Sequence, residues 1–179
     1  EDPNEISRIF VTVDYEWESG YPRYKYNDAI TVNWEYGAFV FMPQSFNSSD
    51  YYYDNDTRKW EKYYSSSSNN PTERADAGLG YYANIGMIQT LIDHAQISVG
   101  GLSGFASLYL EPKNPPTLIS DNFSTGYSRT EIYSDYVHST DIFNGSISFT
   151  YKDFGITVDL SGSPYDSRTT SLSFFYKDI

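Results

Sequence analysis

Alternation of apolar and polar side chains is the feature that most constrains the fold of this chain, because a β-strand with one buried face has that period. The clearest run covers residues 6–17, where apolar side chains stand at every second position: Ile9, Val11, Val13, Tyr15 and Trp17. A second run lies within residues 24–42, where Gly37 predicts a bulge or bend before Pro43 ends the strand. Both regions are therefore predicted to be strands.

Short strands separated by polar turns are also expected in the last third of the chain. The expected strands are 130–137, 141–151, 155–160 and 170–176, and the expected turns are Asn144-Gly145, Asp153-Phe154-Gly155 and Gly162-Ser163-Pro164. Regular spacing of this kind is typical of a sandwich or a barrel. We therefore expect an all-β fold, a single-domain antiparallel β-sandwich of about eight to eleven strands, with an up-and-down β-barrel as the alternative.

Residues 78–110 are expected to supply most of the core, because Asp93 is their only formal charge and Ile and Leu are frequent. Strands are predicted at 79–89, 95–99 and 104–110, with turns at Gly100-Gly101 and Gly104. Ile85, Ile88, Ile92 and Ala95 also stand at helical spacing. A short helix at 84–94 is therefore the alternative, although Gly80, Gly86 and the β-branched residues disfavour it.

The segment 44–77 differs in composition from the rest of the chain. It has no aliphatic side chain between Gln44 and Arg74, so it cannot form a core by itself. We expect a long Tyr- and Ser-rich excursion, with a hairpin whose arms are 51–53 and 59–64, from one β domain that covers residues 6–179. Residues 1–5 precede that domain as a short acidic leader.

A cluster of aromatic side chains in this polar segment is the strongest candidate for a functional site. Its members are Tyr51, Tyr52, Tyr53, Trp60, Tyr63 and Tyr64. Consecutive side chains of a strand point to opposite faces, so some of these rings must be exposed. Tyr combines a flat apolar face with a polar tip, which suits recognition of a sugar, a peptide or a protein. The alternative is that the rings pack across the strands and cover the sheet.

Three acidic side chains of the same segment form a weak candidate for a calcium site. Asp50, Asp54 and Asp56 could offer the oxygen ligands that Ca²⁺ prefers. The pattern lacks the Gly and the distal Glu of an EF-hand loop, so solvated turn carboxylates are the alternative. No other cofactor is expected.

Catalytic chemistry has little support in the sequence. Asp14, Glu16 and Glu18 could act as paired carboxylates on a glycan, although like charges at this spacing also form an ordinary acidic surface. His94 and His138 are interpreted as separate histidines, each at the surface or satisfied by ordinary hydrogen bonds. No nucleophile or phosphate-loop motif is present. The chain is therefore expected not to be an enzyme.

Composition excludes further classes of function. The 179 residues include 12 Lys and Arg against 24 Asp and Glu, for a formal charge of −12, so we expect no nucleic-acid partner. The chain has no Cys, which rules out disulfides, thiolate metal sites and cysteine nucleophiles. No run reaches about 18 apolar residues, so no transmembrane segment is predicted.

The sequence therefore predicts a binding or adhesion module that recognises a glycan or protein ligand through exposed aromatic side chains. A short acidic leader often stands directly after an export signal or a lipid anchor, so we expect an extracellular or cell-surface location. Three alternatives stay open: a structural or assembly subunit of a surface layer or fibre, a polysaccharide-active enzyme with paired carboxylates, and a β-type pore-forming protein with its stem near 124–150. The sequence leaves the oligomeric state undetermined.

Overall fold

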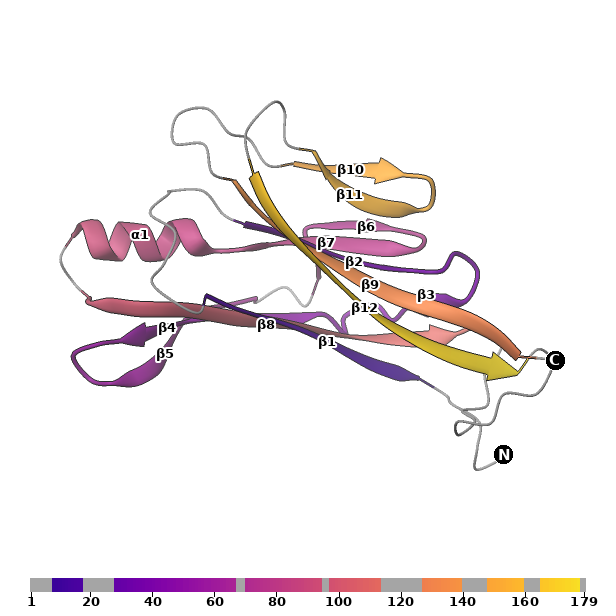
Figure 1. The fold of residues 1–179 in the computed structure, drawn as a ribbon, viewed down its shortest axis with the longest axis horizontal. Helices are drawn as coiled ribbons and strands as arrows, with labels where there is room; N and C mark the ends of the chain where they lie inside the picture. The colour runs from indigo at the N-terminus through magenta and orange to yellow at the C-terminus, as the bar shows by residue number, and fades with distance from the viewer. Residues whose placement is uncertain are drawn as a thin grey trace.

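The computed structural model describes residues 8–17, 28–66, 70–94, 97–113, 127–139, 148–159 and 165–177. Within this part of the chain, twelve strands and one helix form two large sheets and a separate two-stranded hairpin (Figure 1). The expected all-β antiparallel sandwich is confirmed. The described strands divide among open sheets and do not form the closed barrel of the alternative.

The two large sheets are named here after their central strands. The β8 sheet has the order β1 (Ile9–Glu16), β8 (Val99–Pro112), β4 (Asn47–Asp54) and β5 (Lys59–Ser65), and β3 (Phe39–Phe41) also pairs with β8. The β2 sheet has the order β12 (Tyr165–Lys177), β9 (Tyr127–Ser139), β2 (Asp28–Trp34), β7 (Gly78–Ala83) and β6 (Glu73–Ala75). In Figure 1 β2, β7 and β6 lie above β8, β4 and β5, while β9 and β12 run diagonally across the view.

Apolar side chains on the facing sides of the two sheets form the core. The largest fully buried ones are Ile30, Val32, Phe39, Phe41, Phe46, Leu79, Ile85, Ile88, Leu102, Leu108 and Leu110. β1 contributes the face that its alternation predicted, because Val11, Val13 and Tyr15 pack against the core while the residues between them are exposed. The pattern and the packing therefore agree in this strand.

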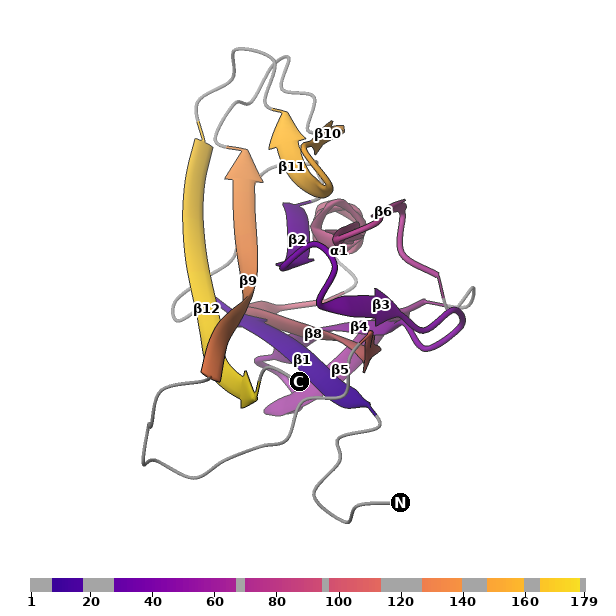
Figure 2. The same ribbon diagram turned by 90° about the vertical axis from the view of Figure 1, so that its right-hand side faces the viewer.

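The strand β2 is buried along its whole length. Ile30, Val32 and Trp34 belong to the core, while the residues between them point to the opposite face of the sheet. That opposite face is buried too, because the hairpin of β10 (Ser148–Lys152) and β11 (Gly155–Asp159) covers it as a third layer (Figure 2). A central strand in this molecule is thus enclosed on both sides.

The side chain of Asn33 fastens the hairpin to β2. Its amide nitrogen donates to the carbonyl of Ile156 at 3.0 Å, and its amide oxygen accepts from the N–H of Ile156 at 2.8 Å. The N–H of Ala77 also donates to the carbonyl of Phe154 at 2.8 Å. Gly80 permits the close approach, since a Cβ there would lie 2.6 Å from the ring of Phe149.

The helix α1 (Ile85–Asp93) replaces the strand predicted at 79–89 beyond Ala83, so the strand prediction is wrong there and the helical alternative holds. Ile85 and Ile88 are fully buried while Met87 is exposed. This one-sided burial explains the outcome, because packing on the core outweighs intrinsic propensity. No helix in the described ranges is long and apolar enough to span a membrane.

The turns predicted at Gly100-Gly101 and Gly104 are also wrong, because all three glycines lie inside the continuous strand β8. Two of them leave space for side chains of neighbouring strands. A Cβ on Gly100 would lie 2.3 Å from the amide oxygen of Asn55, and one on Gly104 would lie 2.4 Å from the ring of Tyr15. Gly100 and Gly104 therefore make room for neighbouring side chains within the sheet, and the chain does not turn at them.

The described parts of the segment 44–77 contribute strands to both large sheets, β4 and β5 to the β8 sheet and β6 to the β2 sheet. β4 lies between β8 and β5, and the predicted hairpin arms pair as expected. Aromatic side chains explain why aliphatic ones are not needed, since Phe46 is buried and Tyr52 packs against the core. The leader at 1–5, Glu18 and the predicted turns at 144–145 and 162–164 lie outside the described residues.

Replacing Asn33 by Ala should lower the free energy of unfolding by about 2–4 kcal/mol, because the buried N–H and carbonyl of Ile156 would both lose their partner. Urea unfolding measures the change. Asn55→Ala is the control, since Asn55 is exposed and its side chain makes a 3.4 Å hydrogen bond to Ser98; it should change stability by less than about 0.5 kcal/mol. Equal stability of the two variants would contradict the anchoring role of Asn33.

Candidate functional site

The outer face of the β8 sheet carries a series of aromatic side chains, which we call the aromatic row. Its members are Phe10, Tyr109, Phe105, Tyr51, Tyr53 and Trp60. The period of the strands places them there. Leu108 and Leu110 of β8 face the core, so Phe105 and Tyr109 point outward, and Tyr52 of β4 packs against the core while its two neighbours point away from it.

Contacts between neighbouring strands hold the rings of the aromatic row in pairs. The centroids of Phe10 and Tyr109 are 5.0 Å apart, those of Tyr53 and Trp60 are 5.6 Å apart edge-on, and those of Tyr51 and Phe105 are 6.4 Å apart with nearly parallel planes. The amino group of Lys62 lies 5.6 Å from the centre of the Tyr51 ring. Rings that are already held lose little conformational entropy when a ligand stacks on them.

A groove of about 330 Å³ lies within the aromatic row. Its walls include Tyr51, Phe105, Ser103, Asp14 and Glu16. Both acidic residues lie on the exposed face of β1, and Glu16 pairs with Ser103 across the two strands. The groove therefore combines flat apolar surfaces with carboxylate acceptors and a hydroxyl group, the mixture that lines specific ligand sites.

The aromatic residues predicted from the sequence divide between the two faces of the β4–β5 hairpin. Tyr51, Tyr53 and Trp60 belong to the aromatic row, and Trp60 is 44% exposed. Tyr52 and Tyr63 pack against the core, with their ring centroids 6.2 Å apart. Tyr64 is half-buried and pairs with Asp50 across the hairpin. Half of the predicted cluster therefore contributes to the outer surface.

The three aspartates considered as calcium ligands are not brought together. Asp50 is buried inside the sandwich, whereas Asp54 accepts from the N–H of Asp56 at 2.8 Å in the exposed hairpin turn. Among the described residues, no three His, Cys, Asp or Glu side chains are grouped to hold a metal ion. Asp54 serves the local turn geometry instead.

Three members of the aromatic row were not selected from the sequence. Phe105 and Tyr109 lie in the segment expected to supply the core, and Phe10 stands at an even position, off the apolar face predicted for residues 6–17. The signal that identifies them is the alternation within β8, since Leu102, Leu108 and Leu110 occupy even positions and the odd positions point to the outer face of the sheet. The expected turns at its glycines had hidden that period.

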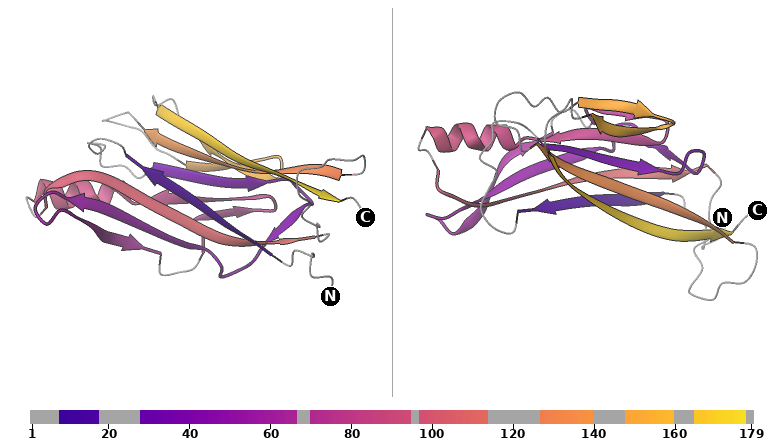
Figure 3. Two further views of the ribbon diagram at one scale, coloured as in Figure 1. Left: turned by 60° about the horizontal axis from the view of Figure 1, so that its bottom comes forward. Right: turned by 45° about the horizontal axis from the view of Figure 1, so that its top comes forward.

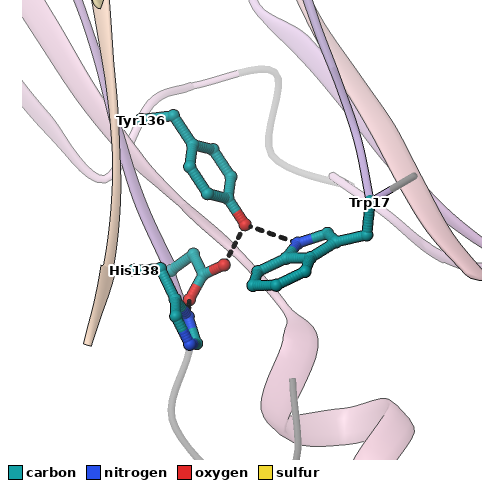
Figure 4. Close-up of polar contacts among 4 residues, drawn as sticks. Trp17, Tyr136 and His138 are labelled. Atoms are coloured by element: carbon teal, nitrogen blue, oxygen red, sulfur yellow. Dashed lines mark hydrogen bonds and ion pairs between the residues drawn. The ribbon is translucent and has the colours of Figure 1, made fainter. Parts of the chain in front are cut away.

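A buried polar network lies between the two sheets, at the start of β2 (Figure 4). The hydroxyl of Tyr136 donates to the carboxylate of Asp28 and accepts from the indole N–H of Trp17 at 2.9 Å. The other carboxylate oxygen of Asp28 is 2.7 Å from Nδ1 of His138. The indole of Trp17 also meets the His138 ring edge-on, with centroids 5.0 Å apart. This network ties β1 to β9 and β2.

A second buried carboxylate, Asp50, ties β4 to β1 and to the start of α1. It accepts from the hydroxyl of Tyr15 at 2.8 Å and from the N–H of Asn84 at 3.0 Å. Tyr15 reaches it across β8, over Gly104, which stands opposite both residues in the sheet. The missing side chain of Gly104 is what allows this bond to form.

Burial is the main cause of the pKa shifts of the two aspartates in these networks. It raises the pKa of Asp28 and that of Asp50, against the effect of their hydrogen bonds, which lower both. An Asp–His pair can serve a general base, but Asp28 is 1% and His138 5% exposed. His94 is exposed near the end of α1, where its Nδ1 lies 2.7 Å from the carbonyl of Thr90. The network therefore joins the two sheets at a place closed to solvent.

Figure 3 shows the two large sheets from further sides, with the β8 sheet and the hairpin layer on opposite faces of the β2 sheet. No protein-family model matches the chain, and no curated protein or solved structure is significantly similar to it. The surface and its chemistry therefore carry the functional interpretation.

Replacing Gly104 by Ala should lower the free energy of unfolding by about 2–4 kcal/mol, because the new Cβ displaces the Tyr15 ring and leaves Asp50 with one donor fewer. Gly101→Ala is the matched control in the same strand, since a Cβ there meets nothing closer than 3.5 Å. It should change stability by less than about 1 kcal/mol. Thermal melts compare the two, and equal losses would show that the space over Gly104 is not needed.

The free energy of unfolding of the Asp50→Asn variant should rise relative to that of the unmodified protein as pH rises from about 4 to about 7. The folded pKa of Asp50 lies above its unfolded value, so the folded state binds the proton more tightly. Its contribution to stability is present below the unfolded pKa and is lost as pH rises through the folded pKa, a loss that Asn does not suffer. Urea titrations across this range measure the difference. The exposed Asp56→Asn is the control, and a parallel pH dependence of both variants would refute the interpretation.

Proposed function

We propose that this protein is a non-enzymatic, exported or surface-attached binding module that holds a neutral polysaccharide along the outer face of its β8 sheet. The observation that carries the proposal is the aromatic row, with the groove of Asp14 and Glu16 between its rings. Sugar rings present flat C–H faces that stack on aromatic side chains, and their hydroxyl groups donate to carboxylates. The groove offers both kinds of surface side by side.

The negative charge of the chain bears on whether the polysaccharide is neutral or acidic. The formal charge is −12, and both charged residues of the groove are acidic. Like charges across a contact oppose binding, so the groove favours a neutral glycan over an acidic one. The same acidic charge opposes binding of an acidic protein.

The shape of the surface favours an extended ligand. Tyr53 stands opposite Gly101 of β8, and the aromatic row runs from there to Tyr109. Eight residue steps of a strand span roughly 26 Å at about 3.3 Å per residue. A polymer of several sugar units fits this length better than a single sugar.

Binding fits the acidic residues better than catalysis does. Asp14 and Glu16 are exposed on one strand face, two positions apart. Glycosidases place one carboxyl group on each side of the bond that is cleaved, whereas these two project from the same side of one strand. Their geometry suits acceptors for sugar hydroxyl groups.

A structural or assembly subunit is the second candidate, and one observation favours it. β12 pairs with β9 over thirteen residues and is the edge of the β2 sheet among the described strands. A long edge strand can pair with a strand of another chain. Concentration-dependent self-association would support this candidate over the binding module.

Removing rings from the aromatic row should weaken glycan binding without unfolding the protein. Affinity electrophoresis in gels that contain laminarin, xyloglucan, galactomannan or arabinoxylan measures retardation. We expect Tyr51→Ala and Trp60→Ala each to reduce affinity by about tenfold, because a ring contact of about 1.4 kcal/mol is lost.

Tyr151→Ala is the matched control for these variants. Tyr151 is 65% exposed and lies on β10, in the hairpin layer, whereas the aromatic row lies on the β8 sheet. Its loss should leave retardation unchanged, and thermal melts confirm that every variant is folded. Failure of the unmodified protein to bind any of the four polysaccharides would overturn the proposal.

A further inference from the structure

A second pocket lies on the opposite side of the molecule from the aromatic row. Its volume is about 390 Å³. Its lining includes Tyr36, Tyr133, Asp135, Lys152, Asp153 and Phe154. It forms where the β10–β11 hairpin meets β9, beside the place where β11 packs on β2, β7 and β6. Figure 2 shows β10 and β11 beside the upper end of β9.

The walls of the pocket are fixed before any ligand binds. The rings of Tyr36 and Phe154 stack with centroids 3.7 Å apart and planes 15° apart. Asn33 and Ala77 hold the hairpin that carries Phe154 through hydrogen bonds to its main chain. Asp135 accepts from the hydroxyl of Thr169 at 2.6 Å. A pre-formed site of this kind binds at a low entropic cost.

Three large rings around the pocket are open to solvent. Tyr36 is 52% exposed, Phe154 49% and Tyr133 40%. Scattered apolar side chains are normal on a protein surface, whereas rings gathered around a pocket indicate an interaction site. The pocket volume lies in the range of small-ligand sites.

The polar groups of the pocket resemble those of the aromatic row. Asp135 and Asp153 are acceptors, and Lys152 is a donor. Glu131 adds to the acidic surroundings of Tyr133, and burial together with these three carboxylates raises the pKa of its hydroxyl. An acidic ligand is therefore disfavoured. A neutral sugar, which both donates and accepts hydrogen bonds and stacks on rings, fits this set of groups.

We propose that this pocket is a second binding site for a neutral polysaccharide, so that one molecule links two separate glycan chains. The proposal rests on the proposed function of the aromatic row. The two sites open on opposite outer faces of the sandwich, with the core between them. Two chains can therefore be held at the same time, and such bivalent binding strengthens attachment without any new contact.

Calorimetry and turbidity test the proposal together, with the polysaccharides named above and their short oligosaccharides as probes. We expect two oligosaccharides per protein molecule and cross-linking of the soluble polymer into a turbid suspension. Tyr133→Ala combined with Asp153→Asn should leave one oligosaccharide per molecule and abolish turbidity. Asn is chosen at position 153 because Asp153 has a φ of 52°, a left-handed backbone conformation that Asn also adopts.

Matched variants separate this inference from the proposed function. Asp159→Asn on β11 removes the same charge outside the pocket and should keep both turbidity and two bound oligosaccharides. A stoichiometry of one that only the aromatic-row variants abolish would overturn the second site and leave the proposed function intact. Absence of any binding would overturn both.

Two further outcomes would also contradict the inference. Turbidity that persists in the pocket variant, with a dimer seen by light scattering, would assign cross-linking to pairing of two copies. The second is binding of spermidine to the pocket. If Asp153→Asn abolished that binding and the oligosaccharide did not compete with it, the pocket would be a site for amines.

Discussion

Enclosure of β2 on both faces is the constraint on which much of this structure depends. The strand lies between the β8 sheet and the hairpin layer, and every one of its seven residues is buried. A buried polar side chain must find hydrogen-bond partners, and Asn33 finds them in the main chain of Ile156. That pairing fixes the hairpin, and the hairpin in turn forms one wall of the second pocket.

The inner side of the sandwich combines an apolar core with two buried carboxylates. Asp28 and Asp50 each join strands of different sequence regions through tyrosine hydroxyl groups. For Asp50 this contact needs a small residue in between, because the ring of Tyr15 crosses directly over Gly104. Removing one of these donors leaves a buried carboxylate oxygen without its hydrogen-bond partner, which is costly.

The sequence predicted the fold class well because period-2 alternation is a local signal. It identified β1, the β4–β5 hairpin and most of β9 without any knowledge of the partners of these strands. It failed where distant packing decides, at Ile85 and Ile88 of α1 and at the glycines of β8. The candidate site was predicted in part for the same reason: composition located Tyr51, Tyr53 and Trp60, but only sheet order brings Phe10, Phe105 and Tyr109 beside them.

The three tryptophans occupy three different environments, and this distribution makes the protein its own fluorescent reporter. Trp60 stands half-exposed in the aromatic row, Trp17 touches the Asp28 network, and Trp34 is buried in the core next to the second pocket. A ligand that stacked on Trp60 would change the emission of a solvent-exposed indole, whereas loosening of the network would change that of Trp17. Single-tryptophan variants therefore resolve ligand contact, sheet separation and core disruption as distinct optical signals.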